Sequence, residues 1–201
     1  MFDAKVRPII DGPLDAAGRW LAARAIGADQ TTIAGFAIGI GAALTIAAGA
    51  FSLGLLLIGL NRLADGLDGA IARATVPTDR GGFLDIALDF GFYAAVPLAF
   101  AVHDPAVNAL PAAFLIASFL ANGTAFLAFA IAAAKRDLTT ADQGVKSFFY
   151  LAGIAEGAET IAVFCAFCLW PAGFAWLAGS FAVLCFISAI ARVLAGWRTL
   201  R

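Results

Sequence analysis

Residues 61–73 read NRLADGLDGAIAR, and residues 81–89, after a gap of seven residues, read GGFLDIALD. The two segments contain four aspartates: Asp65, Asp68, Asp85 and Asp89. The flanking sequence is apolar, with FSLGLLLIGL at residues 51–60 and FGFYAAVPLAFAV at residues 90–102. Carboxylates within such apolar stretches are costly and usually functional. The four aspartates are therefore candidate functional residues.

The composition is that of a membrane protein. Of the 201 residues, 62% are hydrophobic and 13% are charged, and the mean hydropathy is +0.92. Soluble domains are about half apolar and about a quarter charged. This composition excludes a disordered chain, the three cysteines exclude a disulfide scaffold, and the net charge of -1 excludes a nucleic-acid binder that relies on net charge. We expect an all-α integral membrane protein.

The apolar segments give its layout. A helix needs about 20 apolar residues to cross the bilayer, and six segments meet this length, at about 32–51, 53–73, 82–103, 107–134, 147–170 and 173–196. Residues 1–28 instead mix basic and apolar residues, with a helix break expected at Gly12-Pro13, which indicates an amphipathic helix in the membrane interface. We expect this juxtamembrane segment to be followed by one six-helix domain, residues 29–201.

The basic residues predict the orientation. They cluster before the first span, in the loops after the second and fourth spans, and after the sixth: Lys5, Arg7, Arg19 and Arg24; Arg73 and Arg80; Lys135, Arg136 and Lys146; Arg192, Arg198 and Arg201. The other three loops contain no lysine or arginine. By the positive-inside rule both termini and the acidic segments face the cytoplasm. The small size is typical of a protein of the bacterial inner membrane.

Helical periodicity brings the acidic residues together. At about 100° per residue, five residues of 53–73 share a stripe: Asp65, Asp68, Gly69, Ala72 and Arg73. Gly81, Asp85 and Asp89 share a face of the next span. Because the two spans run antiparallel around residues 74–80, all four carboxylates converge at similar depth. Carboxylate oxygens suit Mg²⁺, Mn²⁺ or Ca²⁺, and a two-metal site of this kind commonly serves phosphoryl transfer.

Small residues and an arginine accompany the acids. Gly69 and Ala72 place no large side chain on this stripe, so that a flat group can approach the helix backbone there. The planar guanidinium group of Arg73 can donate two hydrogen bonds to one phosphate group. Together with metal ions, these features predict a site for a nucleotide diphosphate.

The pattern Asp65-x-x-Asp68-Gly69-x-x-Ala72-Arg73…Gly81-x-x-x-Asp85-x-x-x-Asp89 resembles the signature of the CDP-alcohol phosphotransferases, also called CDP-alcohol phosphatidyltransferases. All eight signature positions are present, although the gap of seven residues before Gly81 is one shorter than usual. The family often opens its first span with Pro-Asn-x-x-Thr. Here Thr32 matches, while Asp29 stands in the Asn position and could instead cap the helix.

The resemblance implies a chemistry. Family members transfer the phosphate-bearing part of a CDP-linked donor to an alcohol and release CMP. It implies two ions, Mg²⁺ or Mn²⁺, held by Asp65, Asp68, Asp85 and Asp89, with Asp89 also acting as the base. It further implies a donor site formed by Thr32, Asp68, Gly69, Ala72, Arg73 and Gly81.

The acceptor is less defined. The candidates for its binding site are Lys135, Arg136, Lys146, Glu156 and Arg192, and the basic members favour a phosphorylated alcohol. Glu156 and Glu159 either line that pocket or pair with Arg62, the one arginine that is expected to be buried inside a span, away from its ends. Glycerol 3-phosphate, an inositol phosphate, serine and a second lipid all remain open as acceptors.

Three functions fit these features. The first is phospholipid synthesis with CDP-diacylglycerol as donor, and the second is transfer from a CDP-alcohol to a lipid hydroxyl. The third is a divalent-cation transporter, which the apolar outer halves of the acidic spans disfavour. Membrane lipids are expected partners and nucleic acid is not. Gly35-x-x-x-Gly39 serves close helix packing, either within one chain or in a homodimer.

Overall fold

The computed structural model describes residues 3–136 and 157–200, with side chains from residue 11 onward. All regular structure in these ranges is helical, which confirms the all-α class. The elements are α1 (Asp3–Ala22), α2 (Ala28–Ala47), α3 (Phe51–Ala74), α4 (Asp79–His103), α5 (Pro105–Lys135), α7 (Gly157–Leu169), the 3₁₀ turn η1 (Pro171–Gly173) and α8 (Phe174–Thr199).

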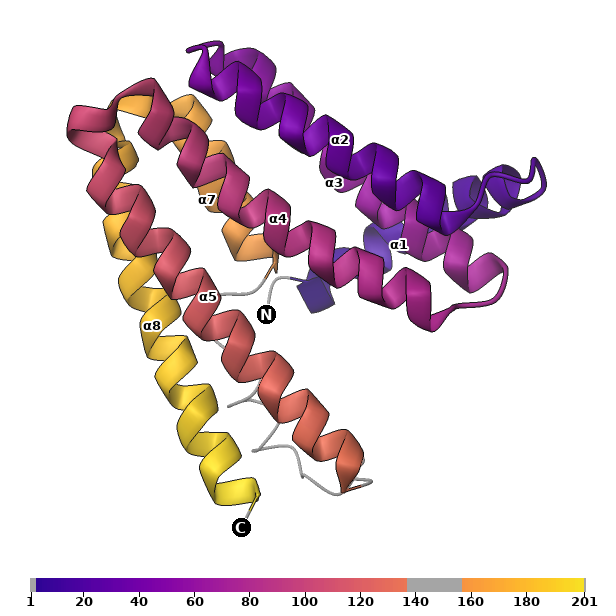
Figure 1. Ribbon diagram of the computed structural model, residues 1–201. Coiled ribbons are helices and arrows are strands. Elements are labelled where there is room, and N and C mark those ends of the chain that lie inside the picture. Colours follow the sequence, from indigo (N-terminus) through magenta and orange to yellow (C-terminus); the bar gives the residue numbers. More distant parts are fainter. Residues whose placement is uncertain (1–2, 137–156, 201) are drawn as a thin grey trace.

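α2 and α3 are joined by a short connection and pack as an antiparallel pair (Figure 1). α5 packs along α8, which comes later in the chain and runs in the same direction as α5. α4 and α7 lie between these two pairs: α4 contacts α2 and α5, and α7 contacts α3 and α8. α1 packs against α3. This arrangement sets the acidic segments of α3 and α4 side by side.

Four of the predicted spans correspond to helices long and apolar enough to cross a membrane within the described ranges. They are α2, α4, α5 and the segment Pro171–Thr199. α3 is long enough at 24 residues, but it carries the charged residues of the acidic segment. α7 is described over 13 residues only, since the predicted span 147–170 begins outside the described residues.

Two local predictions were wrong. The first span was expected at 32–51, whereas α2 runs from Ala28 to Ala47. It ends there because the chain turns at Gly49, whose φ of +81° is a left-handed conformation that glycine adopts without strain. The break expected at Gly12-Pro13 is absent, since α1 continues through both residues. Both are exposed, so solvent can satisfy the carbonyl group that Pro13 leaves without a donor.

An aromatic core fixes the position of α4. The Phe100 ring stacks on Phe174 of α8 with centroids 4.5 Å apart, and it meets Phe167 of α7 at 5.6 Å. About one turn of α7 closer to the acidic residues, Phe164 meets Phe92 of α4 at 5.9 Å. All five rings are buried. In lipid such contacts stabilise through close packing rather than through release of water, and they hold α4 firmly against α7 and α8.

The Gly35-x-x-x-Gly39 spacing serves packing within the chain. A Cβ atom at Gly35 would lie 2.9 Å from Cβ of Ala64, and one at Gly39 would lie 2.7 Å from the Phe92 ring. Both glycines are therefore covered by α3 and α4 of the same chain. Their absent side chains let α2 approach the two acidic helices closely, and a homodimer would have to use another surface.

Candidate active site

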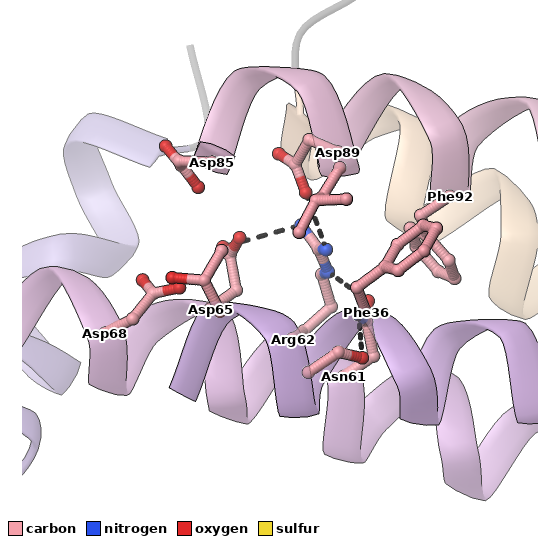
Figure 2. Close-up of a pocket in the computed structure, with 11 residues that line it drawn as sticks. Phe36, Asn61, Arg62, Asp65, Asp68, Asp85, Asp89 and Phe92 are labelled. Atoms are coloured by element: carbon pink, nitrogen blue, oxygen red, sulfur yellow. Dashed lines mark hydrogen bonds and ion pairs between the residues drawn. The ribbon is translucent and has the colours of Figure 1, made fainter. Parts of the chain in front are cut away.

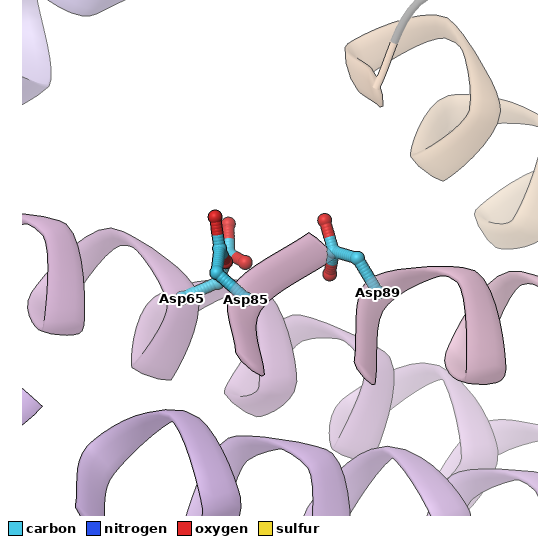
Figure 3. A group of neighbouring side chains, drawn as sticks. All are labelled: Asp65, Asp85 and Asp89. Atoms are coloured by element: carbon cyan, nitrogen blue, oxygen red, sulfur yellow. The ribbon is translucent and has the colours of Figure 1, made fainter. Parts of the chain in front are cut away.

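Aspartates from α3 and α4 meet in one pocket. One carboxylate oxygen each of Asp65, Asp85 and Asp89 lies within 4.8 Å of the other two. Figure 3 shows the three carboxylates pointing to the same side of the α3–α4 pair. Asp65 and Asp89 are half-buried and Asp85 is exposed, so the cluster is open at one side. Like charges this close repel one another strongly unless cations are present.

The pocket around these carboxylates is formed by three helices. Besides the three clustered aspartates, its lining consists of the following residues (Figure 2): Thr32, Gly35, Phe36, Asn61, Arg62, Asp68, Leu88 and Phe92. Polar side chains come mainly from α3 and α4, and apolar ones come from α2 and α4. The site is thus a polar recess within an apolar bundle.

Asp68 is the most buried of the four aspartates, with 7% of its surface exposed. Its Oδ2 atom is buried and accepts no hydrogen bond from any described residue. The Thr32 side chain of α2 interacts with the same carboxylate. A buried carboxylate oxygen without a partner is costly, and a bound cation would remove that cost. The donor set therefore fits one or more oxygen-preferring divalent ions.

Arg62 lies at the centre of the pocket. Its Nη2 donates to Oδ1 of Asp89 at 2.9 Å, and its Nη1 lies 3.4 Å from Oδ2 of Asp65. The hydroxyl of Tyr93 donates to Oδ2 of Asp89 at 3.3 Å. Both oxygens of Asp89 are thus held by neighbouring side chains. The sequence placed Arg62 beside the acidic stripe but assigned it no role in the site, and Tyr93 was missed.

A second group of charged side chains lies at the end of the site that is nearest to the loop between α3 and α4. Arg73 ends the acidic segment of α3, and its Nη2 donates to Oδ1 of Asp15 in α1 at 2.8 Å. A Cβ atom at Gly69 would lie 3.4 Å from Nη1 of Arg73, in ordinary van der Waals contact with this side chain. Ala72, on the same stripe, is half-buried. Sequence reasoning did not find Asp15.

Asp29 does not cap α2, because the N-cap residue is Gly27. Asp29 lies in the first turn and accepts a hydrogen bond from Nε of Arg80 at 2.8 Å. A Cβ atom at Gly81 would lie 3.2 Å from both Oδ1 of Asp29 and Oγ1 of Thr78, so this position requires a small residue. Thr78 itself caps α4 by accepting from the Gly81 amide at 3.0 Å.

The predicted acceptor residues lie apart from this pocket or outside the described residues. Lys135 and Arg136 are exposed at the end of α5. Arg192 of α8 lies over the Phe126 ring, 5.3 Å from its centroid. None of the three lines the acidic pocket. Lys146 and Glu156 fall outside the described residues.

Known proteins match this chain in sequence and in fold. It is 46% identical over all 201 residues to inner membrane protein YnjF of Escherichia coli, covering 98% of that protein. It is 37% identical over 87 residues to archaetidylinositol phosphate synthase of Pyrococcus horikoshii, which is 43% of this chain and 46% of that enzyme. No protein-family model matches the chain.

The fold matches a solved structure, that of Mycobacterium tuberculosis phosphatidylinositol phosphate synthase PgsA1 with CDP-DAG bound. The TM-score is 0.65 at 21% identity, over 92% of this chain and 93% of that chain. The shared fold, the acidic site and the sequence match to archaetidylinositol phosphate synthase together indicate an all-helical membrane transferase. The chain belongs to the CDP-alcohol phosphatidyltransferase family, whose enzymes act in phospholipid synthesis.

Proposed function

We propose that the protein transfers a phosphatidyl group from CDP-diacylglycerol to the hydroxyl of a polar alcohol and releases CMP. The observation that carries this proposal is the convergence of Asp65, Asp85 and Asp89 within 4.8 Å. The donor is supported by the fold likeness to PgsA1, whose structure was solved with CDP-DAG bound. No feature of the described residues favours a CDP-alcohol such as CDP-choline as donor, and family membership argues against a cation transporter.

We propose two Mg²⁺ or Mn²⁺ ions as cofactors, held by Asp65, Asp68, Asp85 and Asp89. The unpartnered Oδ2 of Asp68 supports this, because a cation there would satisfy it. When bound, the ions would neutralise the donor diphosphate and make its phosphorus more electrophilic. Thr32, Gly69, Ala72, Arg73 and Gly81 would hold the CDP part of the donor.

Asp89 is the general base of this proposal. It accepts the proton of the acceptor hydroxyl while that oxygen forms a bond to the phosphorus that carries diacylglycerol. The bond from this phosphorus to the bridging oxygen breaks, and CMP leaves with the electron pair. Arg62 and Tyr93, which hold one oxygen each of Asp89, fix the orientation of the carboxylate.

The acceptor of the proposal is a phosphorylated alcohol. The basic residues Lys135, Arg136, Lys146 and Arg192 would bind its phosphate, with Glu156 beside its hydroxyl groups. Two relatives are named as inositol phosphate lipid synthases, so an inositol phosphate is the first acceptor to test. Glycerol 3-phosphate, serine and a lipid alcohol follow it in the panel.

We further propose six spans: the four apolar helices, α3, and the apolar segment of about residues 147–170, of which α7 is the described part. Residues 1–28 form the interfacial segment, and residues 29–201 form the catalytic domain. Both termini and the active site would face the cytoplasm of a bacterium. The relative YnjF, an inner membrane protein, supports this membrane.

The test is an assay of the detergent-purified protein with labelled CDP-diacylglycerol, Mg²⁺ or Mn²⁺, and each acceptor in turn. CMP release and a new phospholipid should appear together with one acceptor and disappear in Asp89→Asn. If no acceptor and no CDP-alcohol supports CMP release, in protein that still binds Mn²⁺, the proposed reaction is wrong.

A further inference from the structure

Arg62 bridges the two acidic helices. It lies on α3 one turn before Asp65, and its guanidinium contacts a carboxylate of its own helix and one of α4 (Figure 2). Its side chain is 19% exposed, and that of Asp89 is 27% exposed. An arginine at this depth in an apolar helix is costly without partners. Here it neutralises part of the charge of the two carboxylates that it contacts, those of Asp65 and Asp89.

The guanidinium is held from its other sides as well. Nε donates to Oδ1 of Asn61 at 2.8 Å, and Nδ2 of Asn61 donates to the Gly35 carbonyl of α2 at 2.8 Å. Asn61 is 3% exposed. The Phe92 ring lies 5.0 Å from the guanidinium carbon, which is within the range of a cation–π contact. Groups from α2, α3 and α4 therefore fix the position of this one charge.

We infer that Arg62 is a positioning residue that serves the acidic site as a built-in counter-ion. It holds Asp89 by Oδ1 in the orientation that proton transfer needs, and it keeps the carboxylates of α3 and α4 assembled before a divalent cation binds. This inference rests on the proposed function, because it concerns the same acidic site. Because Arg62 pairs with carboxylates that would bind the cations, it also competes with those cations.

The competition predicts an unusual result for its removal. In Arg62→Met, the acidic site loses a positive charge and keeps its oxygen ligands. At about 4 Å and an effective dielectric constant of about 20, a unit charge changes the affinity for another unit charge by about 10³-fold, and its effect on a divalent ion is larger. Allowing for solvent at this open site, we expect Mn²⁺ to bind Arg62→Met at least about tenfold more tightly than wild type. Turnover should fall at the same time, because Asp89 loses its orientation.

The experiment compares four detergent-purified proteins: wild type, Arg62→Met, Arg62→Lys and Arg198→Met. Arg198 is exposed in the last turn of α8 and serves as the matched control. Mn²⁺ affinity is measured by electron paramagnetic resonance, and the melting temperature is measured with and without Mn²⁺. Arg62→Met should melt lower than wild type without Mn²⁺ and gain more from Mn²⁺. Arg62→Lys keeps the charge, so its Mn²⁺ affinity should stay within about threefold of wild type.

Kinetics then separates positioning from packing. Arg62→Met should lose at least about tenfold in kcat with the donor KM within a few-fold, and Arg62→Lys should recover part of kcat. Wild-type or weaker Mn²⁺ affinity in Arg62→Met, or an equal loss of melting temperature with and without Mn²⁺, would overturn the inference. If Arg62→Met does not accumulate, Arg62→Gln takes its place with the same criteria. The Mn²⁺ measurements need no substrate, so they decide on Arg62 even if the proposed reaction fails.

Discussion

Replacing Asp89 by asparagine tests the proton-transfer step while leaving the pocket in place. The structure shows why the change is mild in geometry. Oδ1 of Asp89 accepts from Arg62 at 2.9 Å and Oδ2 accepts from Tyr93 at 3.3 Å. Asparagine keeps an oxygen for Arg62, and its amide group can donate to the Tyr93 oxygen. What it loses is one negative charge and the ability to accept a proton.

The loss of a general base lowers turnover by about 10²–10⁴-fold, which is about 2.7–5.5 kcal/mol of activation free energy. With Mn²⁺ at saturating concentration, donor binding should stay within a few-fold, since asparagine retains an oxygen that can ligate a metal. The assay measures CMP release under single-turnover conditions, so that chemistry and not product release limits the rate. Equilibrium binding of a labelled CDP-donor to the same preparations gives the second number.

Asp68→Asn is the matched control, because it removes a carboxylate from the same pocket without touching the proposed base. Asp68 is buried and its Oδ2 has no hydrogen-bond partner among the described residues. Its replacement should weaken Mn²⁺ and nucleotide binding together. Near-normal single-turnover rates in Asp89→Asn would refute the assignment of Asp89 as the base. The base would then have to be a group of the substrate or a metal-bound group.

Further outcomes follow from the same structure. Exhaustive chelation should abolish activity and added Mn²⁺ should restore it, measured as CMP release; full activity without metal contradicts the acidic site. Asp15→Asn removes the carboxylate that pairs with Arg73 at 2.8 Å. Since a donor phosphate must compete with this carboxylate for Arg73, the KM for the donor should fall a few-fold. The melting temperature should change little, because the ion pair is exposed. Gly39→Leu drives a side chain into Phe92, 2.7 Å from its Cβ position; overpacking of this kind costs about 1–3 kcal/mol, and the melting temperature should drop clearly, while an unchanged value would mean that α2 is not packed this closely. A cysteine at Thr140 should resist membrane-impermeant reagents applied outside intact cells, and efficient labelling would reverse the proposed topology.

Hydropathy found the helices but not all of their ends. It predicted a helix near each of the six α-helices that the described residues contain after residue 27. It missed the end of α2 because Ala48 and Ala50 are as apolar as the helix itself. The turn there depends on the left-handed conformation of Gly49, which a hydropathy window does not see. At Gly12-Pro13 the opposite error arose, since residue preference favoured a break that an exposed helix tolerates.

Within one helix, sequence spacing predicted which side chains share a face. Asp85 and Asp89, four residues apart, point to the same side (Figure 3), as the helical period requires. Their approach to Asp65 followed from a short loop and antiparallel helices. The same reasoning did not find the contacts of Asp15 with Arg73 or of Asp29 with Arg80. Each joins two separate helices, and such a contact depends on how both helices are rotated and offset along their axes.

Arg62 is the instructive case, because a signal for it was present. An ionisable residue inside a span deserves a functional hypothesis with a named partner, and this reasoning was applied to the aspartates. For Arg62 the partners proposed from the sequence were Glu156 and Glu159 of another span. Asp65, three residues further on the same helix, was overlooked, although the structure contains this contact. The second partner, Asp89, lies on α4, and its approach needs the close packing of α2 against α3 and α4 that Gly35 and Gly39 allow. The small residues of α2 therefore contribute to the site without lying among its charged groups: they set the distance at which one arginine can reach carboxylates on two helices.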